Sequence, residues 1–358
     1  MLEHRIKKVV IMAGGTGGHV IPALSVANIL KNRNISITWL GTCQGIESEL
    51  VPASGINIDY IDIEGLRSTK IMKWFKAPYI LTKSFLQAVA IIRRESPDII
   101  LGLGGFASGP GGVAARIMGL PLVIHEQNSI PGITNKLLAK IATRVLTAFP
   151  NTLPRGEWVG NPVRKEICDL SPSSFIGADE PRPPRILILG GSLGAVALNK
   201  KIPLALSTIE KKYKPEIRHQ SGRANFEETK QSYKNVNLKV SVEKFISNMA
   251  EAYDWADMVI SRAGALTISE LSAAGVGALL IPYPYAVDDH QFYNGQWLVD
   301  RDAAYMIREE DLTNSRLVSI LNKWLGDPKI LISMAKNAKK SSKLDAAELI
   351  ADICMEAS

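Results

Sequence analysis

Short apolar runs rich in Val and Ile alternate with stretches of helical pattern along most of the chain. In the first half, these runs predict strands at Val9–Met12, Ile35–Leu40, Ile56–Ile61, Asp98–Leu101, Leu122–His125 and Arg144–Leu146. In the second half, they predict strands at Ile186–Leu189, Glu216–His219, Leu238–Val240, Met258–Ser261, Ala278–Ile281 and Ala303–Ile307. Strands that alternate with helices form parallel sheets covered on both faces. The pattern therefore predicts an α/β protein with two Rossmann-like, doubly wound domains.

The alternation is lost between residues 150 and 184, and residues 171–185 are rich in proline, serine and acidic residues, as linkers are. We therefore expect domains at 1–163 and 164–340, followed by a C-terminal helix within 341–358. A length of 358 residues fits two domains, each with its own core. Two such domains facing each other would form a cleft at the carboxyl ends of both sheets, where ligands of open α/β sheets bind.

Composition and cysteine usage point to a cytosolic globular protein. No run of about 18 apolar residues is present, and the apolar segment near the N-terminus is too short for a cleavable signal. The three cysteines are far apart and form no C-x-x-C pair. This spacing disfavours both a disulfide framework and a cysteine metal cluster.

The net charge of +7 is unevenly distributed, because the segment from Gly65 to Arg94 has seven Lys or Arg and no Asp or Glu. Apolar and aromatic residues such as Trp74 and Phe75 are interleaved with these cations. One interpretation is an amphipathic helix with solvated lysines. The other is docking to an anionic membrane surface, where each lysine gains roughly 1 kcal/mol. Nucleic acid is a weaker candidate, because the rest of the chain has no basic stripe.

Three glycine-rich turns follow predicted strands, within residues 11–30, 101–119 and 186–200. Such turns place backbone N–H groups at helix N-termini, where phosphates bind. The first reads GGTGGH and is no dinucleotide fingerprint, because Val20 stands where the third glycine would be. A single glycine turn is often only a steric feature of a tight connection. Three turns in two domains favour close backbone approach to diphosphate and sugar groups.

Polar residues follow two of the predicted strands. His19 comes after the first glycine turn, and an imidazole with a pKa of roughly 6.5 can accept a hydroxyl proton at neutral pH. The alternative is an ordinary polar residue at a helix start. Residues 125–128 (HEQN) are expected on a loop that recognises a hydroxyl-rich ligand, or else as a helix cap at Asn128 or Ser129. Zinc is disfavoured, because the H-E-x-x-H pattern is not completed.

A third group of candidates lies within residues 261–295. Gly264–Thr267 can offer backbone N–H groups to phosphate at a helix N-terminus. Glu270, one turn later, can accept hydrogen bonds from ribose hydroxyls, and Gln291 can reach a sugar. Core packing would not require Glu270 or Gln291.

The motifs GGTGGHVIPALSVA, GGFASGPGGVAA, HEQNSIPGITNK, VGNPVR, LGGSLGA and SRAGALTISEL occur in this order. In this, nearly the whole chain resembles the MurG family of bacterial N-acetylglucosaminyltransferases of peptidoglycan synthesis, which have the B-type glycosyltransferase fold. The resemblance implies transfer of GlcNAc from UDP-GlcNAc to the C4 hydroxyl of MurNAc in undecaprenyl-pyrophosphoryl-MurNAc-pentapeptide (lipid I). Transfer with anomeric inversion would give lipid II for cell wall biogenesis, and hence for cell shape and division.

The resemblance also implies a set of site residues. In the N-terminal half it implies donor contacts at Thr16, Gly17, Gly18 and Asn128, with Arg164 and Ser192 near the diphosphate. In the C-terminal half it implies Ile246 beside the uracil, Ala265, Leu266, Thr267, Ile268, Ser269 and Glu270 on ribose and phosphate, and Gln291 on GlcNAc. His19 matches the proposed general base, and Glu126 is a second functional candidate.

By the same resemblance we expect no metal and no cofactor, since Arg164 and helix N–H groups can stabilise the departing diphosphate. Residues 66–94 would be the docking face of a peripheral enzyme on the cytoplasmic face of the inner membrane. The final helix would pack back onto the N-terminal domain. Two departures from the family pattern are Gly277, where proline is frequent, and residues 283–291, about one residue longer than expected. The latter affects the register of Gln291.

Two other functional classes fit parts of the pattern. A UDP-GlcNAc 2-epimerase shares the fold and the donor, but it needs no membrane-facing patch, and its acid–base carboxylates are not evident. A non-catalytic nucleotide-binding protein docked on a membrane would bind the donor without turnover. Transfer of GlcNAc to the acceptor distinguishes a transferase from both of these classes.

Overall fold

The computed structural model describes residues 6–63, 71–172, 182–191 and 194–357, with only the backbone at 71–76. The chain divides into two compact units. The N-terminal unit contains residues 1–164 and 343–358, and the C-terminal unit contains residues 165–342. These boundaries lie one and two residues from those expected, and the last segment of the chain is part of the N-terminal unit.

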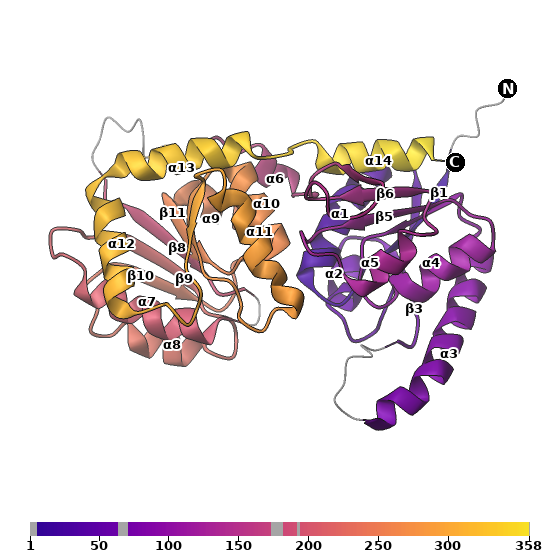
Figure 1. The fold of residues 1–358 in the computed structure, drawn as a ribbon, viewed down its shortest axis with the longest axis horizontal. Coiled ribbons are helices and arrows are strands. Elements are labelled where there is room, and N and C mark those ends of the chain that lie inside the picture. The colour runs from indigo at the N-terminus through magenta and orange to yellow at the C-terminus, as the bar shows by residue number, and fades with distance from the viewer. Residues whose placement is uncertain (1–5, 64–70, 173–181, 192–193, 358) are drawn as a thin grey trace. The chain divides into compact units, whose positions relative to one another are not determined.

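The N-terminal unit is built on a parallel sheet, of which Figure 1 labels β1, β3, β5 and β6. Its strand order is β3-β2-β1-β4-β5-β6-β7. Its strands are β1 (Lys8–Met12), β2 (Ser36–Gly41), β3 (Asn57–Tyr60), β4 (Ile99–Gly102), β5 (Leu122–Glu126), β6 (Arg144–Thr147) and β7 (Gly156–Trp158). Its helices are α1 (Gly17–Asn32), α2 (Glu47–Ala53), α3 (Ile71–Glu95), α4 (Ser108–Ile117), α5 (Ile133–Leu138) and α14 (Ala346–Glu356).

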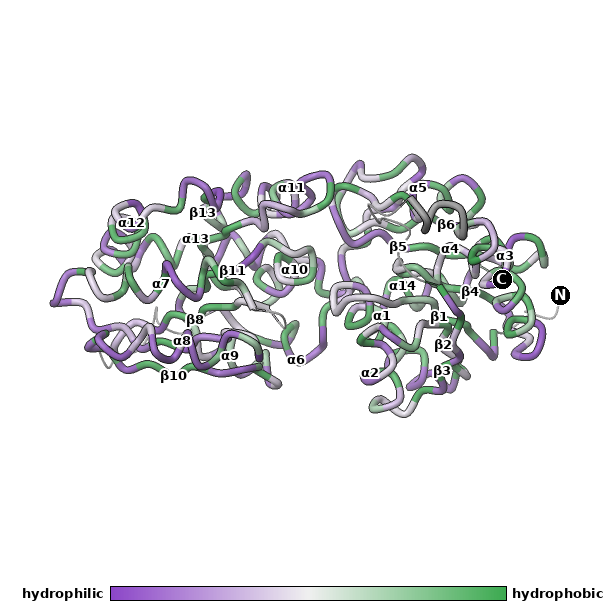
Figure 2. Tube along the Cα trace, turned by 90° about the horizontal axis from the view of Figure 1, so that it is seen from below, coloured by the Kyte–Doolittle hydropathy of each residue, from purple (hydrophilic) through white to green (hydrophobic). Residues whose placement is uncertain are grey.

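The two faces of this sheet explain why its strands are apolar at nearly every position, as the hydropathy colouring of Figure 2 illustrates for β1 and β4. Val9 and Ile11 of β1 belong to a core that includes residues of α1 and α14. Val10 and Met12 belong to a second core with residues of α3 and α4. Helices cover both faces, so alternate residues of one strand are buried on opposite sides. Helix α14 packs against α1.

The C-terminal unit repeats this architecture with a parallel sheet of order β10-β9-β8-β11-β12-β13. Its strands are β8 (Arg185–Leu189), β9 (Glu216–Gln220), β10 (Val240–Glu243), β11 (Met258–Ser261), β12 (Gly277–Leu280) and β13 (Ala304–Met306). Its helices are α6 (Lys165–Cys168), α7 (Val196–Thr208), α8 (Phe226–Ser232), α9 (Met249–Trp255), α10 (Ala265–Ala274), η2 (Val287–Asp289), α11 (His290–Val299), α12 (Asn314–Gly326) and α13 (Pro328–Lys340). The prediction of two doubly wound α/β domains is confirmed.

Two local predictions were wrong. The stretch 150–184 contains β7 and α6. Strand β7 escapes detection because it is a short edge strand whose residues remain partly exposed. The strand expected at Leu238–Val240 begins only at Val240 and runs to Glu243, because the Leu238 N–H donates to the Val236 carbonyl and closes a turn there.

Gly277 at the start of β12 has a packing reason. A Cβ atom at this position would lie 2.7 Å from the Cβ of Met334 on α13. The close approach of helix to strand therefore excludes a larger residue unless α13 shifts.

Among the helices of the described residues, none combines the length and the apolar character needed to cross a bilayer.

Candidate functional site

The first glycine turn connects β1 to α1 and is fixed by a buried carboxylate. Thr16 precedes α1, and its carbonyl accepts hydrogen bonds from the N–H groups of His19 and Val20. Gly15 has φ +89°, and its N–H donates to Oε2 of Glu47 at 2.9 Å. Glu47 begins α2 and is fully buried. Gly17 and Gly18 are the first two residues of α1, so no side chain projects from the backbone at these positions.

The second glycine turn, between β4 and α4, packs against the first. A Cβ atom on Gly105 would lie 2.4 Å from the carbonyl oxygen of Gly14, and one on Gly104 would lie 2.8 Å from Nδ1 of His19. The hydroxyl of Ser108 donates to the Met12 carbonyl at 3.1 Å and to the Gly104 carbonyl at 2.8 Å. Glycine is required at 104 and 105 both by this contact and by their positive φ values.

His19 is held from one side by a glutamine that follows β5. Nδ1 of His19 lies 2.9 Å from Oε1 of Gln127. The amide Nε2 of Gln127 donates to the carbonyl of Leu103 at 2.7 Å, and Gln127 is buried. The amide oxygen that faces His19 can only accept, so Nδ1 must carry the proton and a neutral ring keeps its lone pair on Nε2.

The expectation of a polar loop at residues 125–128 was partly wrong, because His125 and Glu126 are the last residues of β5 and are buried. Nε2 of His125 lies 2.8 Å from the Gly160 carbonyl. Burial lowers the pKa of His125 to about 4, so this imidazole is neutral at physiological pH.

The carboxylate of Glu126 is occupied by hydrogen bonds within the protein. Its carboxylate accepts hydrogen bonds from the Asn128 N–H at 2.9 Å, the Gly132 N–H at 3.2 Å and Nδ2 of Asn135 at 2.9 Å. Nδ2 of Asn128 also lies 3.3 Å from the same carboxylate. Helix α5 begins at Ile133 after Gly132, so neither Asn128 nor Ser129 is its N-cap. Glu126 therefore shapes the loop that presents Asn128.

In the C-terminal unit, α10 begins directly after β11 with Gly264 as its N-cap and no side-chain cap. The predicted segment Ala265–Glu270 forms its first six residues, of which Ala265, Ile268 and Glu270 are buried. Glu270 is 5% exposed, and its Oε2 accepts a hydrogen bond from the Tyr253 hydroxyl at 3.0 Å. Ile246 is also buried.

Gln291 lies in the first turn of α11 and joins two strand ends. Its Oε1 accepts hydrogen bonds from the N–H of Tyr283 at 2.9 Å and from the N–H of Ala263 at 3.3 Å. The oxygen is thus used by the protein, and Nε2 is the group left for a ligand. The preceding residues Asp288 and Asp289 both have positive φ, which marks the loop whose length was in question.

Two further predicted residues lie near the junction of the units and in the third glycine turn. Arg164 is half-buried and ends the first of the two segments that form the N-terminal unit. The third glycine turn, between β8 and α7, includes Gly191 and Gly194 with positive φ, whereas Ser192 lies outside the described residues.

The basic segment 66–94 forms helix α3 from Ile71 onward, and Trp74 and Phe75 lie outside the residues whose side chains are described. Among the cations whose side chains are described, Lys83 pairs with Asp62 at 2.7 Å, and Arg94 pairs with Asp59 and Glu95. Exposed apolar side chains on α3 and on the adjacent α4 are Tyr79, Leu81, Leu86, Val113 and Ile117.

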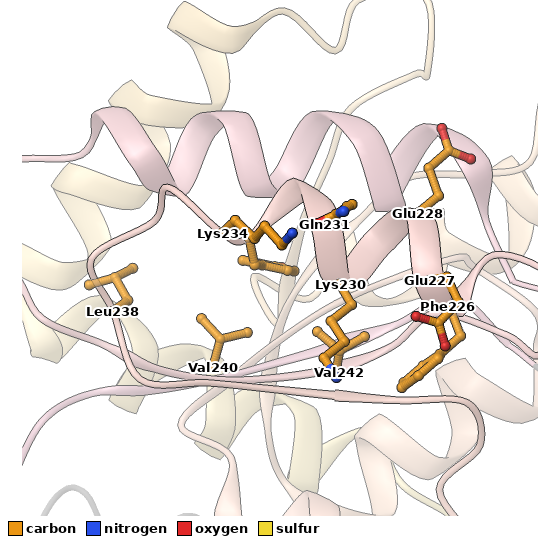
Figure 3. Close-up of a pocket in the computed structure, with 10 residues that line it drawn as sticks. Phe226, Glu227, Glu228, Lys230, Gln231, Lys234, Leu238, Val240 and Val242 are labelled. Carbon is orange, nitrogen blue, oxygen red and sulfur yellow. The ribbon is translucent and has the colours of Figure 1, made fainter.

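A pocket of about 690 Å³ lies elsewhere, between α8 and the edge strand β10 (Figure 3). Leu238, Val240 and Val242 line one side, and Phe226 and Lys230 contribute from α8. No predicted site residue lines it. In the described part of the chain, no three His, Cys, Asp or Glu side chains gather as metal ligands.

Sequence reasoning missed Glu47 and Tyr253, and it gave Gln127 no individual role. Glu47 lies among polar residues after β2, and its spacing carries no signal of burial. Tyr253 lies two residues before Trp255, and nothing in this spacing marks its hydroxyl for a polar role. In both residues the polar group is held by a partner distant in sequence, so the pairing becomes visible only in the fold.

The comparisons with known proteins agree over nearly the whole chain. Residues 9–147 match the model of the glycosyltransferase family 28 N-terminal domain, and residues 185–350 match that of the family 28 C-terminal domain. A relative from Cellvibrio japonicus is 48% identical over 97% of this chain and 98% of its own length. One from Chromohalobacter salexigens is 45% identical over 100% of this chain and 99% of its own. Both are named UDP-N-acetylglucosamine–N-acetylmuramyl-(pentapeptide) pyrophosphoryl-undecaprenol N-acetylglucosamine transferase.

Among solved structures, Acinetobacter baumannii MurG has a TM-score of 0.84 and 38% identity, covering 98% of this chain and 99% of its own. The kitacinnamycin glycosyltransferase, at 16% identity and a TM-score of 0.68, shares the fold. The predicted family is thereby confirmed. The chain belongs to glycosyltransferase family 28 and, within it, to the MurG family of N-acetylglucosamine transferases.

Proposed function

We propose that this chain transfers GlcNAc from UDP-GlcNAc to the C4 hydroxyl of MurNAc in lipid I, and so produces lipid II for peptidoglycan synthesis. The observation that carries this function is the 44–48% identity over nearly full length to proteins named for this transfer. The geometry around His19 supports it, because a hydroxyl acceptor needs a base and the Nε2 lone pair provides one.

In the proposed mechanism, Nε2 of His19 accepts the proton of the acceptor hydroxyl as the oxygen attacks C1 of GlcNAc. The bond from C1 to the diphosphate oxygen breaks, UDP leaves, and the anomeric configuration inverts. The N–H groups at the start of α10 and the guanidinium of Arg164 offset the charge that develops on the diphosphate. This role requires no metal ion.

The donor contacts are assigned as follows. Thr16, Gly17, Gly18 and Asn128 contribute from the N-terminal unit, and we assign Arg164 and Ser192 to the diphosphate. Ile246 packs beside the uracil, and the segment Ala265–Glu270 binds ribose and phosphate, with Glu270 accepting from ribose hydroxyls. Nε2 of Gln291 donates to a GlcNAc hydroxyl, since its oxygen is already bonded to backbone N–H groups. The burial of Ile268 restricts its part to the backbone.

We further propose that the enzyme is peripheral on the cytoplasmic face of the cell membrane and docks on anionic lipid through α3 and α4. The support is the set of exposed apolar side chains on these two helices, which includes Leu86 at 59% and Ile117 at 68% exposure. Apolar groups of this kind enter the headgroup boundary, while nearby lysines gain from anionic lipid.

The transfer is tested with labelled UDP-GlcNAc and a short-chain lipid I analogue, without added metal. We expect a β-linked disaccharide product and no UDP-ManNAc. Formation of UDP-ManNAc without disaccharide would identify an epimerase, and donor binding without any product would identify a binding protein.

Membrane docking is tested by sedimentation with phosphatidylglycerol vesicles. We expect the double variant Leu86→Ser and Ile117→Ser to bind several-fold more weakly than wild type. Leu204→Ser, which removes an equally exposed leucine from α7 in the C-terminal unit, serves as the control. Equal vesicle binding by wild type and the double variant contradicts the assignment.

A further inference from the structure

We propose that Gln127 is a positioning residue that fixes the tautomer and the orientation of the His19 ring. The inference rests on the proposed role of His19 as general base. Gln127 would act through His19 and would need no contact with either substrate.

The orientation of the Gln127 amide is determined by the backbone. Its Nε2 donates to the Leu103 carbonyl at 2.7 Å, and the N–H of Leu103 donates to the Met12 carbonyl at 2.8 Å. The amide is thus tied to the second glycine turn, whose position depends on β1. A flipped amide would place its oxygen against the Leu103 carbonyl oxygen, which is repulsive. Oε1 therefore faces His19, 2.9 Å from Nδ1.

This arrangement selects one tautomer of the neutral ring. An acceptor facing Nδ1 keeps the proton on Nδ1, so the lone pair is on Nε2. The opposite tautomer would bring the Nδ1 lone pair against Oε1. The ring is also confined by Gly104, where the position of a Cβ atom would be only 2.8 Å from Nδ1. Orientation and tautomer are therefore fixed before the acceptor binds.

A neutral amide beside the His19 ring suits its proposed role as a base better than a charged group would. A carboxylate in this place would stabilise the imidazolium ion, whereas an amide orients the ring without adding charge. Titratable groups near this end of α1, among the described residues of the N-terminal unit, include His125 on β5, which interacts electrostatically with His19, Glu47 on α2, which contacts Gly15, and Glu126 next to His125. His125 is neutral through burial, and the two carboxylates are bonded to other donors.

The first test is spectroscopic and uses the wild-type enzyme. Nitrogen-15 NMR of protein labelled at histidine, with His19→Gln to assign the signal, reports which ring nitrogen of His19 carries the proton above pH 7. We expect protonated Nδ1 and unprotonated Nε2 in wild type, and a shift toward protonated Nε2 in Gln127→Met. Protonated Nε2 in wild type overturns the proposal.

The second test is kinetic. Gln127→Met keeps the volume and removes both hydrogen bonds, and we expect kcat to fall about tenfold. The Kd for UDP-GlcNAc should stay within about twofold. In His19→Ala, adding Gln127→Met should cause no further loss, because the two residues act as one unit. Gln231→Met on the exposed surface of α8 is the matched control and should behave as wild type.

The outcomes separate this inference from the proposed function. If His19→Ala abolishes transfer while Gln127→Met retains wild-type kcat, His19 is the base and the inference about Gln127 is wrong. If the losses in kcat of the two single variants add in the double variant, Gln127 acts independently of His19. This result also overturns the inference. If His19→Ala retains wild-type transfer, the proposed base is wrong, and the role of Gln127 in catalysis falls with it.

Discussion

Glu47 and Gly15 are joined by a hydrogen bond from the backbone N–H of Gly15 to Oε2 of the carboxylate, 2.9 Å long. The other oxygen, Oε1, accepts from the N–H and the hydroxyl of Thr42, at 3.1 and 2.7 Å. A Cβ atom on Gly14 would lie 2.4 Å from Oε1. The glycines of the first turn are therefore needed to let a fully buried carboxylate approach the backbone.

This relationship predicts the effect of Glu47→Gln. An amide has only one acceptor oxygen, so its NH₂ group must face the N–H of either Gly15 or Thr42. We expect the free energy of unfolding to fall by roughly 1–3 kcal/mol and kcat to fall with it, because the turn carries Thr16 and His19. Urea unfolding and transfer assays measure the two effects. Glu49→Gln, at an exposed position on α2, is the control; equal behaviour of both variants would refute the assignment.

The contact between the two glycine turns predicts a difference between two alanine substitutions. Gly105 and Gly119 have similar φ values, +86° and +74°. A Cβ on Gly105 would lie 2.4 Å from the Gly14 carbonyl oxygen, whereas nothing lies within 4 Å of one on Gly119. We expect Gly119→Ala to cost about 1 kcal/mol of backbone strain and Gly105→Ala to cost more and to abolish transfer. Thermal unfolding and transfer assays compare the two variants. Similar losses of stability and activity in both would contradict the contact between the two glycine turns.

Burial of His125 predicts that stability depends on pH. Its pKa falls from 6.5 in the unfolded chain to about 4 in the folded protein. The unfolded state thus binds more protons between these values, so the contribution of about 3 kcal/mol is present above pH 6.5 and is lost as pH falls to 4. His125→Phe should show a flatter dependence than wild type in urea unfolding across this range. His290→Phe, at a half-buried site, is the control; an unchanged dependence in His125→Phe would refute the prediction.

In the C-terminal unit, Tyr253→Phe should weaken donor binding. The tyrosine hydroxyl donates to Oε2 of Glu270 and so orients the carboxylate that we assign to the ribose. We expect the Kd for UDP-GlcNAc to rise about three- to tenfold. The free energy of unfolding should also fall by roughly 1–3 kcal/mol, because the buried carboxylate loses a donor. Calorimetric titration gives the Kd. Tyr213→Phe, outside the proposed site, should bind UDP-GlcNAc with the wild-type Kd. A wild-type Kd for Tyr253→Phe would contradict the assignment of Glu270 to the ribose.

The fold could be predicted from the sequence because both sheets are parallel and covered on both faces. Strands such as β1 and β8 are then apolar at nearly every position and are easily recognised. Edge strands lack this constraint. Strand β7 is three residues long and partly exposed, and it was missed for that reason.

The glycine turns and the polar residues after the strands were also visible in the sequence, since parallel strands bring their carboxyl ends to one edge. The sequence did not show which side chains meet at this edge. The bond from Gln127 to His19 spans 108 positions, and the bond from Glu47 to Gly15 spans 32. Glu126, which was expected on an open loop, is buried, and its carboxylate accepts hydrogen bonds from Gly132 in the following loop and from Asn135 on α5. Such pairings follow from the assembled fold and leave no periodic signal.

The most direct test of the central claim compares wild type with His19→Ala in the transfer of labelled GlcNAc from UDP-GlcNAc to a short-chain lipid I analogue. UDP-GlcNAc binding and thermal unfolding, measured on the same samples, verify that the variant is folded and binds the donor. We predict lipid II analogue from the wild type and a loss of at least a hundredfold in kcat for His19→Ala. Wild-type transfer by the variant would contradict the base assignment, and no transfer by a folded, donor-binding wild type would contradict the function itself.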